Sequence, residues 1–205
     1  MKKIVAIILI SVMMLSLIAC GGESDESTPP PTSETNIEEA ADTTAPETDE
    51  PDDNVPTEYK SALKKAKDYS ETLYMSKAAI YDQLTSEYGE QFSEEAAQYA
   101  MDNYEGDWKG NALVKAKEYS DSMHMSKAGI YEQLMSEYGE QFTEEEAQYA
   151  IDNVEADWKA NALAKAKEYQ ELMDMSPAAI RDQLSSEYGE KFTNEEADYA
   201  VSNLG

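Results

Sequence analysis

The hydrophobic positions of this chain recur with the spacing of α-helices. Leu63, Ala66 and Ser70 follow one another at intervals of three and four residues, which places them on one face of a helix. Ile80 and Leu84 follow four residues apart and predict a second helix. Alternation of polar and apolar residues, the mark of a half-buried strand, occurs nowhere in the chain. The pattern therefore predicts an all-α protein.

The helical pattern is written three times. The run Ser-Glu-Tyr-Gly-Glu occupies residues 86–90, 136–140 and 186–190, an offset of 50 residues each time. A fixed period of this size indicates a tandem array of one supersecondary unit. We predict three repeats of three helices each, helix-turn-helix-like in form, over residues 57–106, 107–156 and 157–205.

Helix start and stop signals recur at fixed places in each repeat. Residues of N-cap type, including a serine followed by Pro177, are expected to begin the three helices at Thr57, Asp107 and Asp157, at Ser76, Ser126 and Ser176, and at Ser93, Thr143 and Thr193. Thr143 with Glu146 and Thr193 with Glu196 spell capping boxes. Gly89, Gly139 and Gly189 are expected to end the second helix in the left-handed conformation.

The two junctions between repeats differ in sequence. Gly106 and Gly110 at the first junction are replaced by Ala156 and Ala160 at the second. Because alanine favours a helix interior by about 1 kcal/mol over glycine, we expect the third helix of repeat 2 to continue unbroken into repeat 3. The alternative is a cap at Asp157 followed by a bend.

The recurrent aromatic residues are expected to be mostly structural. Trp108 and Trp158 share one phase, at which the first repeat has Glu58. This is consistent with tryptophans that pack between adjacent repeats, since the first repeat has no preceding neighbour. Tyrosines also recur in every repeat, and the spacing assigns them to the core: Tyr69, Tyr88 and Tyr99 with their counterparts 50 and 100 residues on.

The first twenty residues have the character of an export signal. Lys2 and Lys3 precede an apolar run too short to span a membrane comfortably, and Ala19 precedes Cys20. Leu, a tolerant position, Ala and then Cys is the lipobox pattern of bacterial lipoproteins. This resemblance implies a signal peptide over residues 1–19, diacylglycerol on the Cys20 thiol, and a protein held through that lipid on the outer face of the cell membrane. Cys20 is the only cysteine, so an intramolecular disulfide is impossible.

Charge narrows the range of partners. The chain carries 43 acidic and 16 basic residues, a net charge of −27. Residues 20–56 are rich in acids and prolines and contain no aromatic residue, which predicts a disordered tether behind the lipid. Residues 58–205 hold 14 basic and 31 acidic residues, a net charge of −17. Such a surface repels nucleic acid, and it either favours basic partners or simply keeps an exposed protein soluble. We expect a monomer.

The sequence offers no catalytic constellation. It has no cysteine and histidine set for zinc, no loop with calcium-binding spacing and no glycine-rich phosphate loop. The single histidine, His124, stands where the other repeats have Tyr74 and Asp174, so we interpret it as surface variation. We therefore expect neither enzymatic activity nor a cofactor or metal.

A recurrent set of acids around the turn between the second and third helices is the remaining candidate site. Two interpretations stay open: a solvated face that also caps helices, or a docking surface for a basic protein segment. The nine candidates are Glu87, Glu90, Glu95, Glu137, Glu140, Glu145, Glu187, Glu190 and Glu195.

The repeat resembles that of a known family. The run Ala-Leu-x-Lys-Ala-Lys-x-Tyr, then Met-Ser, Gln-Leu, Ser-Glu-Tyr-Gly-Glu-x-Phe and Ala-x-Tyr-Ala, is similar to the repeat of the Ltp family. These are host cell surface-exposed lipoproteins of Gram-positive bacteria and their prophages. The resemblance implies superinfection exclusion: the lipoprotein blocks injection of incoming phage DNA by engaging a tail component such as the tape-measure protein. The alternative is a general adhesion or scaffold lipoprotein that binds another basic partner.

Overall fold

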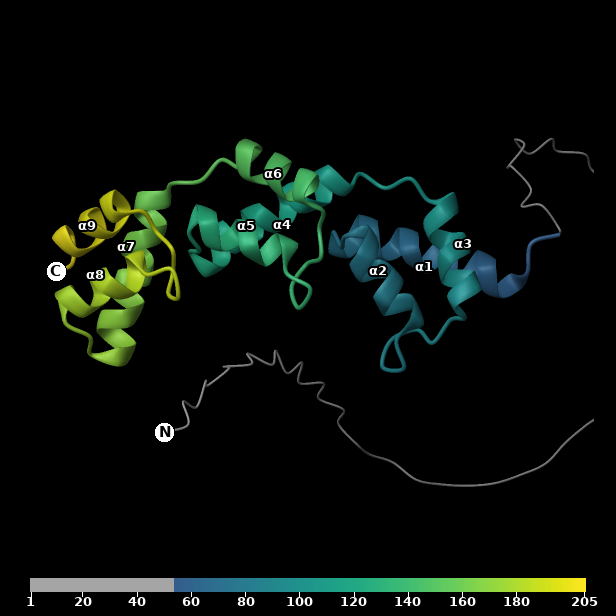
Figure 1. Ribbon diagram of the computed structural model, residues 1–205, viewed down its shortest axis with the longest axis horizontal. Coiled ribbons are helices and arrows are strands. Elements are labelled where there is room, and N and C mark those ends of the chain that lie inside the picture. Colours follow the sequence, from purple (N-terminus) through teal and green to yellow (C-terminus); the bar gives the residue numbers. More distant parts are fainter. Residues whose placement is uncertain (1–53) are drawn as a thin grey trace, which may run out of the picture. The chain divides into compact units, whose positions relative to one another are not determined.

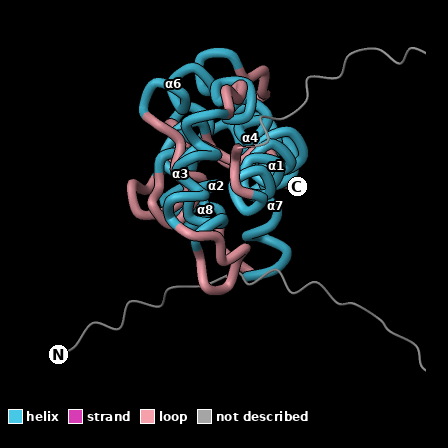
Figure 2. Tube along the Cα trace, turned by 90° about the vertical axis from the view of Figure 1, so that its right-hand side faces the viewer, coloured by secondary structure: helices cyan, strands magenta, loops and turns pink. Residues whose placement is uncertain are grey.

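The computed structural model describes residues 54–205 (Figure 1). This part of the chain contains nine helices and no strand. The helices are drawn in cyan in Figure 2. The predicted signal peptide, Cys20 and all of the predicted tether up to residue 53 lie outside the described residues. The helices are α1 (Thr57–Leu73), α2 (Lys77–Thr85), α3 (Glu94–Asn103), α4 (Trp108–Met123), α5 (Lys127–Met135), α6 (Glu144–Asn153), α7 (Trp158–Met173), α8 (Pro177–Ser185) and α9 (Asn194–Ser202).

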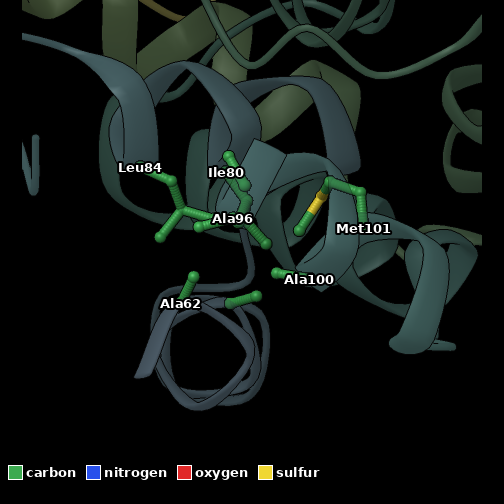
Figure 3. Packing of buried hydrophobic residues seen from close by; sticks show 8 residues of the cluster. Ala62, Ile80, Leu84, Ala96, Ala100 and Met101 are labelled. Carbon is green, nitrogen blue, oxygen red and sulfur yellow. The ribbon is translucent and has the colours of Figure 1, made fainter. Parts of the chain in front are cut away.

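Each repeat is a three-helix unit with its own small core. We call them repeat 1 (α1–α3), repeat 2 (α4–α6) and repeat 3 (α7–α9). In repeat 1, buried alanines such as Ala62 on α1 and Ala100 on α3 let these two helices approach closely. Ile80 and Leu84 of α2 fill the space beside them (Figure 3). Full burial of an Ile or Leu side chain contributes roughly 1.5–3 kcal/mol, so these two positions anchor each unit.

Most of the predicted helix starts are confirmed. The Ser76, Ser126 and Ser176 hydroxyls each accept the backbone N–H three residues on. Thr143 with Glu146 and Thr193 with Glu196 form both bonds of the capping box. Asp107 and Asp157 cap α4 and α7. Thr57, in contrast, is the first residue of α1, and Pro56 occupies the N-cap position without a side-chain bond.

In repeat 1 the missing half of the capping box comes from another helix. Ala96 stands where the later repeats have a glutamate, and Ser93 keeps only its own cap bond. The Ser93 backbone N–H donates instead to Glu58 Oε1 at 2.8 Å. That bond ties the start of α3 to the first turn of α1, and it lowers the pKa of the Glu58 carboxyl.

The expectation of left-handed glycines is wrong. Helix α2 ends at Thr85, with Ser86 as its extended C-cap, and Gly89 does not have positive φ. A glycine is required there for space, because a Cβ would lie 2.2 Å from the Gln83 carbonyl oxygen. The left-handed residue of this turn is Gln91, at φ 57°, with Gln141 and Lys191 at the same phase.

The expectation of a continuous helix between repeats 2 and 3 is also wrong. Helix α6 ends at Asn153 and α7 begins at Trp158, so both junctions break at the same phase. Asp157 accepts the Ala160 N–H at 3.0 Å, and Val154 turns to an extended conformation. The cap at Asp157 and the packing of Trp158 on the preceding core therefore outweigh the helical preference of the two alanines.

Contacts join each repeat to the one before it. Trp108 packs against the core of repeat 1, where it meets Tyr104 edge-on, and Trp158 packs against the core of repeat 2. The prediction that the tryptophans pack between adjacent repeats is confirmed. Asn111 and Asn161 add buried hydrogen bonds across the same two junctions. Among the described residues no helix is long and apolar enough to cross a membrane.

Candidate protein-interaction surface

The nine candidate glutamates cluster around one turn in each repeat, between its second and third helices. In repeat 1 this turn, residues 86–92, is held by backbone bonds. Gly89 N–H donates to the Ser86 carbonyl at 3.0 Å, Glu90 N–H to the Gln83 carbonyl at 3.0 Å, and Phe92 N–H to the Leu84 carbonyl at 2.9 Å. Equivalent bonds recur in repeats 2 and 3. The structure thus presents three copies of one ordered turn, with the glutamates in three different environments.

The first environment points inward and holds Glu90, Glu140 and Glu190. In each repeat a tyrosine hydroxyl of the first helix donates to the carboxylate at 2.5 Å: Tyr69 to Glu90, Tyr119 to Glu140 and Tyr169 to Glu190. The side chains of Glu90 and Glu140 are only 23% and 17% exposed. These three glutamates fasten the turn to the first helix, so most of their binding capacity is used within the repeat.

In repeat 1 the tyrosine–glutamate bond shifts the pKa of both partners. The Tyr69 hydroxyl, and secondarily Lys65 at 2.9 Å, lowers the pKa of Glu90, and burial, followed by the bond to Glu90, raises the pKa of Tyr69. Burial, together with the bond to Glu190, raises the pKa of Tyr169 to about 12. Burial and the bond to Glu140 raise the pKa of Tyr119 further. At neutral pH the Tyr69–Glu90 pair is therefore a neutral phenol donating to an ionised carboxylate, which is a strong charge-assisted bond.

The second environment holds Glu95, Glu145 and Glu195, at the start of the third helix. Lys109 lies 2.7 Å from Glu145, and Lys159 lies 2.7 Å from Glu195. The same two ammonium groups lie 5.7 Å over the rings of Tyr149 and Tyr199. The hydrogen bond from each lysine lowers the pKa of its glutamate.

Repeat 1 departs from this arrangement because Tyr59 replaces the lysine. Its ring lies 5.2 Å from the ring of Tyr99. Glu95 is exposed, as Glu145 and Glu195 are, but it consequently has no ion pair in the described part of the chain.

The third environment holds Glu87, Glu137 and Glu187, at the outer end of the turn. These side chains are exposed and make no ion pair or side-chain hydrogen bond among residues 54–205. Of the nine predicted site residues, these three and Glu95 leave their carboxylates free. The remaining five bind tyrosine hydroxyls or lysines within the structure.

Sequence reasoning missed the tyrosine beside each of Glu87, Glu137 and Glu187. Tyr88, Tyr138 and Tyr188 were expected in the core, but their exposed fractions are 98%, 98% and 99%. Spacing suggested burial because Tyr88 follows Leu84 by four residues, but the helix ends before it. The signal in the sequence was Ser86, whose hydroxyl accepts the Tyr88 backbone N–H at 3.2 Å and stabilises the turn.

No group of three or more metal-ligating side chains occurs in residues 54–205. One groove of about 650 Å³ in repeat 1 is lined by Lys60, Lys64 and Lys67 beside Tyr99 and Tyr104. None of the nine candidate glutamates lines this groove, and its three lysines outnumber its one acid, Glu71.

An all-helical tandem-repeat protein with acidic turns is the class that this fold and site define. The family model for host cell surface-exposed lipoproteins matches residues 57–104, 107–154 and 157–204. The chain belongs to this family, and each match covers one three-helix repeat.

One solved structure is also similar to this chain. It is the structure of Ltp, a superinfection exclusion protein from the Streptococcus thermophilus temperate phage TP-J34. The two are 44% identical, the match covers 50% of this chain and 100% of the other, and the TM-score is 0.45. No curated protein matches the chain.

Proposed function

We propose that this protein excludes superinfecting phages from the cell that carries it. Anchored through lipidated Cys20 outside the membrane, its repeats bind a basic segment of an incoming phage tail, such as the tape-measure protein, and thereby block DNA injection. The observation that carries the proposal is membership of the family of host cell surface-exposed lipoproteins over all three repeats. The solved relative is described as a superinfection exclusion protein, and this is the activity we propose here.

The charge of the repeats supports a basic partner. Residues 58–205 have a net charge of −17, which attracts cationic protein segments and repels phosphate backbones. Unpaired carboxylates recur at Glu87, Glu137 and Glu187, so every repeat offers the same kind of contact. An acidic protein held at the surface by a lipid meets a tail protein before the phage DNA reaches the cytoplasm.

The test separates phage adsorption from DNA entry. The full-length protein is expressed in a phage-sensitive host, and adsorbed particles and intracellular phage DNA are measured for a panel of tail types. We expect normal adsorption and blocked DNA entry for at least one tail type. Cys20→Ala, which leaves the repeats unchanged and removes the lipid attachment, is expected to restore DNA entry.

The contrary results are equally definite. Unimpeded DNA entry across the whole panel would contradict the proposal and favour an adhesion or scaffold protein with another basic partner. Full blocking by Cys20→Ala would contradict the requirement for the lipid anchor.

A further inference from the structure

Three tyrosine side chains stand almost completely in water, one at the tip of each turn. Tyr88, Tyr138 and Tyr188 are 98–99% exposed, and none of their side chains contacts another described residue through a hydrogen bond or ring contact. A ring so exposed contributes nothing to the core of its repeat. Exposed aromatic rings on ordered scaffolds are typical of the anchor residues of protein interfaces.

The turn that carries each ring is ordered by its own bonds. Besides the backbone bonds described above, the Ser136 hydroxyl accepts the Tyr138 N–H at 3.2 Å and the Ser186 hydroxyl accepts the Tyr188 N–H at 3.1 Å. The backbone beneath the ring is therefore already in place before any partner binds. A preorganised turn lowers the entropic cost of binding through its side chain.

Comparison of the three repeats shows which residues of the turn the fold requires. Ser86 caps the turn, Gly89 leaves room for the Gln83 carbonyl, and Glu90 binds Tyr69. Glu87 and Tyr88 have no such role, yet both are identical in all three repeats.

Many exposed positions elsewhere in the repeat vary between the three copies. The phase of Thr72, for example, holds Ser122 and Leu172 in the later repeats. The fold therefore leaves the identity of the Glu-Tyr pair unexplained, and a ligand would explain it.

The protein itself shows what a glutamate and a tyrosine side chain hold together. Lys109 Nζ lies 2.7 Å from Glu145 and 5.7 Å over the ring of Tyr149. The same arrangement recurs for Lys159 with Glu195 and Tyr199. In both cases a carboxylate and the face of a phenol ring bind one ammonium group, by ion pairing and by cation–π attraction.

We propose that the Glu-Tyr pairs at residues 87–88, 137–138 and 187–188 are the contact points for a lysine- and arginine-rich segment of the partner protein. Each pair binds one cationic side chain through the carboxylate and the ring. One contact of this kind is weak, and three on one chain bind a segment with several cationic residues by raising its effective concentration. The inference rests on the basic partner of the proposed function and names the side chains that bind it.

The test measures the affinity of the full-length lipoprotein, in detergent micelles, for a fluorescent synthetic lysine-rich peptide at low ionic strength. We expect the triple variant Tyr88→Ala, Tyr138→Ala and Tyr188→Ala to bind at least about tenfold more weakly. The corresponding triple Phe variant keeps the rings and is expected to stay within about twofold of the unsubstituted protein. Because the three side chains are 98–99% exposed, far-UV circular dichroism should still show the same helical content.

A matched pair of charge variants separates the tip from the general acidity of the surface. The tip variant combines Glu87→Gln, Glu137→Gln and Glu187→Gln and so removes three charges at the tips. Glu71→Gln, Asp121→Asn and Glu171→Gln together remove three exposed charges from the first helices. We expect the tip variant to weaken peptide binding several-fold more than the helix variant. Equal losses, or unchanged binding by the triple Tyr→Ala variant, would overturn the inference.

Phage infection distinguishes failure of this inference from failure of the proposed function. If the unsubstituted protein blocks DNA entry and the triple Tyr→Ala variant blocks it equally well, the exclusion function stands and the tip contacts are wrong. Loss of the block in that variant supports both. If the unsubstituted protein blocks no phage, the exclusion function fails, and peptide binding alone then decides whether the tips bind cationic segments.

Discussion

Asn111 Nδ2 lies 2.9 Å from Ser70 Oγ, and the two residues belong to different repeats. The same amide group also donates to the Met75 carbonyl at 3.0 Å. Asn161 repeats both bonds with Ser120 and Met125, at 2.9 and 3.1 Å. Both asparagines are less than one tenth exposed, so the two junctions share a buried polar lock.

Repeats 1 and 3 each have a different residue at one of the two positions of this lock. Repeat 1 has the exposed Ser61 at the asparagine phase, and repeat 3 has Gln170 at the serine phase.

Removal of the lock should destabilise the array. Asn111→Ala leaves Ser70 Oγ and the Met75 carbonyl without their buried donor, and we expect a loss of about 1–3 kcal/mol in the free energy of unfolding. Ser61→Ala, at the same phase of repeat 1, is the control and should change it by less than about 0.5 kcal/mol. Urea unfolding followed by circular dichroism measures both, and equal stability of the two variants would contradict a role for the lock.

Because Tyr169 is partly buried, we expect the protein to lose stability at alkaline pH. The pKa of Tyr169 is raised from 10.0 to about 12 in the folded protein. A raised pKa stabilises the fold fully below pH 10, and this contribution is lost as the pH rises from 10 towards 12.

Tyr169→Phe isolates this contribution. It should lower the stability at neutral pH, because Glu190 loses its hydroxyl donor, and it should flatten the decline between pH 10 and 12. Tyr188→Phe, at an exposed tip, is the control and should leave the stability at neutral pH unchanged. Free energies of unfolding measured from pH 8 to 12 provide the comparison, and parallel profiles for Tyr169→Phe and the unsubstituted protein would refute it.

The surface pair of Lys109 and Glu145 should be visible in a titration of the carboxyl group. The hydrogen bond from Lys109 lowers the pKa of Glu145. Its stabilising effect is present above the ordinary glutamate pKa and is lost as the pH falls through the lowered value.

In Lys109→Met we expect the pKa of Glu145 to rise towards the ordinary glutamate value. Glu195, still paired with Lys159, serves as the internal control and should not change. Carboxyl chemical shifts recorded by NMR against pH at low salt measure both groups, and an unmoved Glu145 would show that the pair is absent in solution.

Two glycine substitutions in repeat 2 should have opposite effects. At Gly139 a Cβ would lie 2.4 Å from the Gln133 carbonyl oxygen, so Gly139→Ala must displace the turn and should cost about 1–3 kcal/mol. At Gly110 the Cβ would meet only the side chain of the cap residue Asp107. Ala160 occupies the same phase in repeat 3 and keeps that cap bond.

Gly110→Ala should therefore be neutral or stabilise the protein by up to about 1 kcal/mol. Thermal unfolding of the two variants side by side gives the comparison. A destabilised Gly110→Ala with a tolerated Gly139→Ala would reverse the interpretation of both sites.

The sequence by itself determined the features that depend on neighbouring residues. The three repeats follow from exact spacing, and the helix starts at Ser76 and Thr143 follow from a side chain that binds an N–H three residues away. Packing of Trp108 and Trp158 against the preceding repeat was also predictable, because the first repeat has Glu58 at that phase. The cap bonds join residues only three apart, and the repeats recur at a constant offset, so both can be recognised in the sequence.

Only the tertiary structure decided which of the recurrent tyrosines and glutamates are bonded within a repeat and which are exposed. Tyr69 and Tyr88 look equivalent in the sequence, yet one is fastened to Glu90 and the other stands in water. Glu87 and Glu90 differ in the same way. The difference depends on where α2 ends and on which helix the turn then meets, and the partner of Glu90 lies 21 residues away. Local propensity carries no information about such a partner, because the distance between the two side chains is set only when the three helices pack.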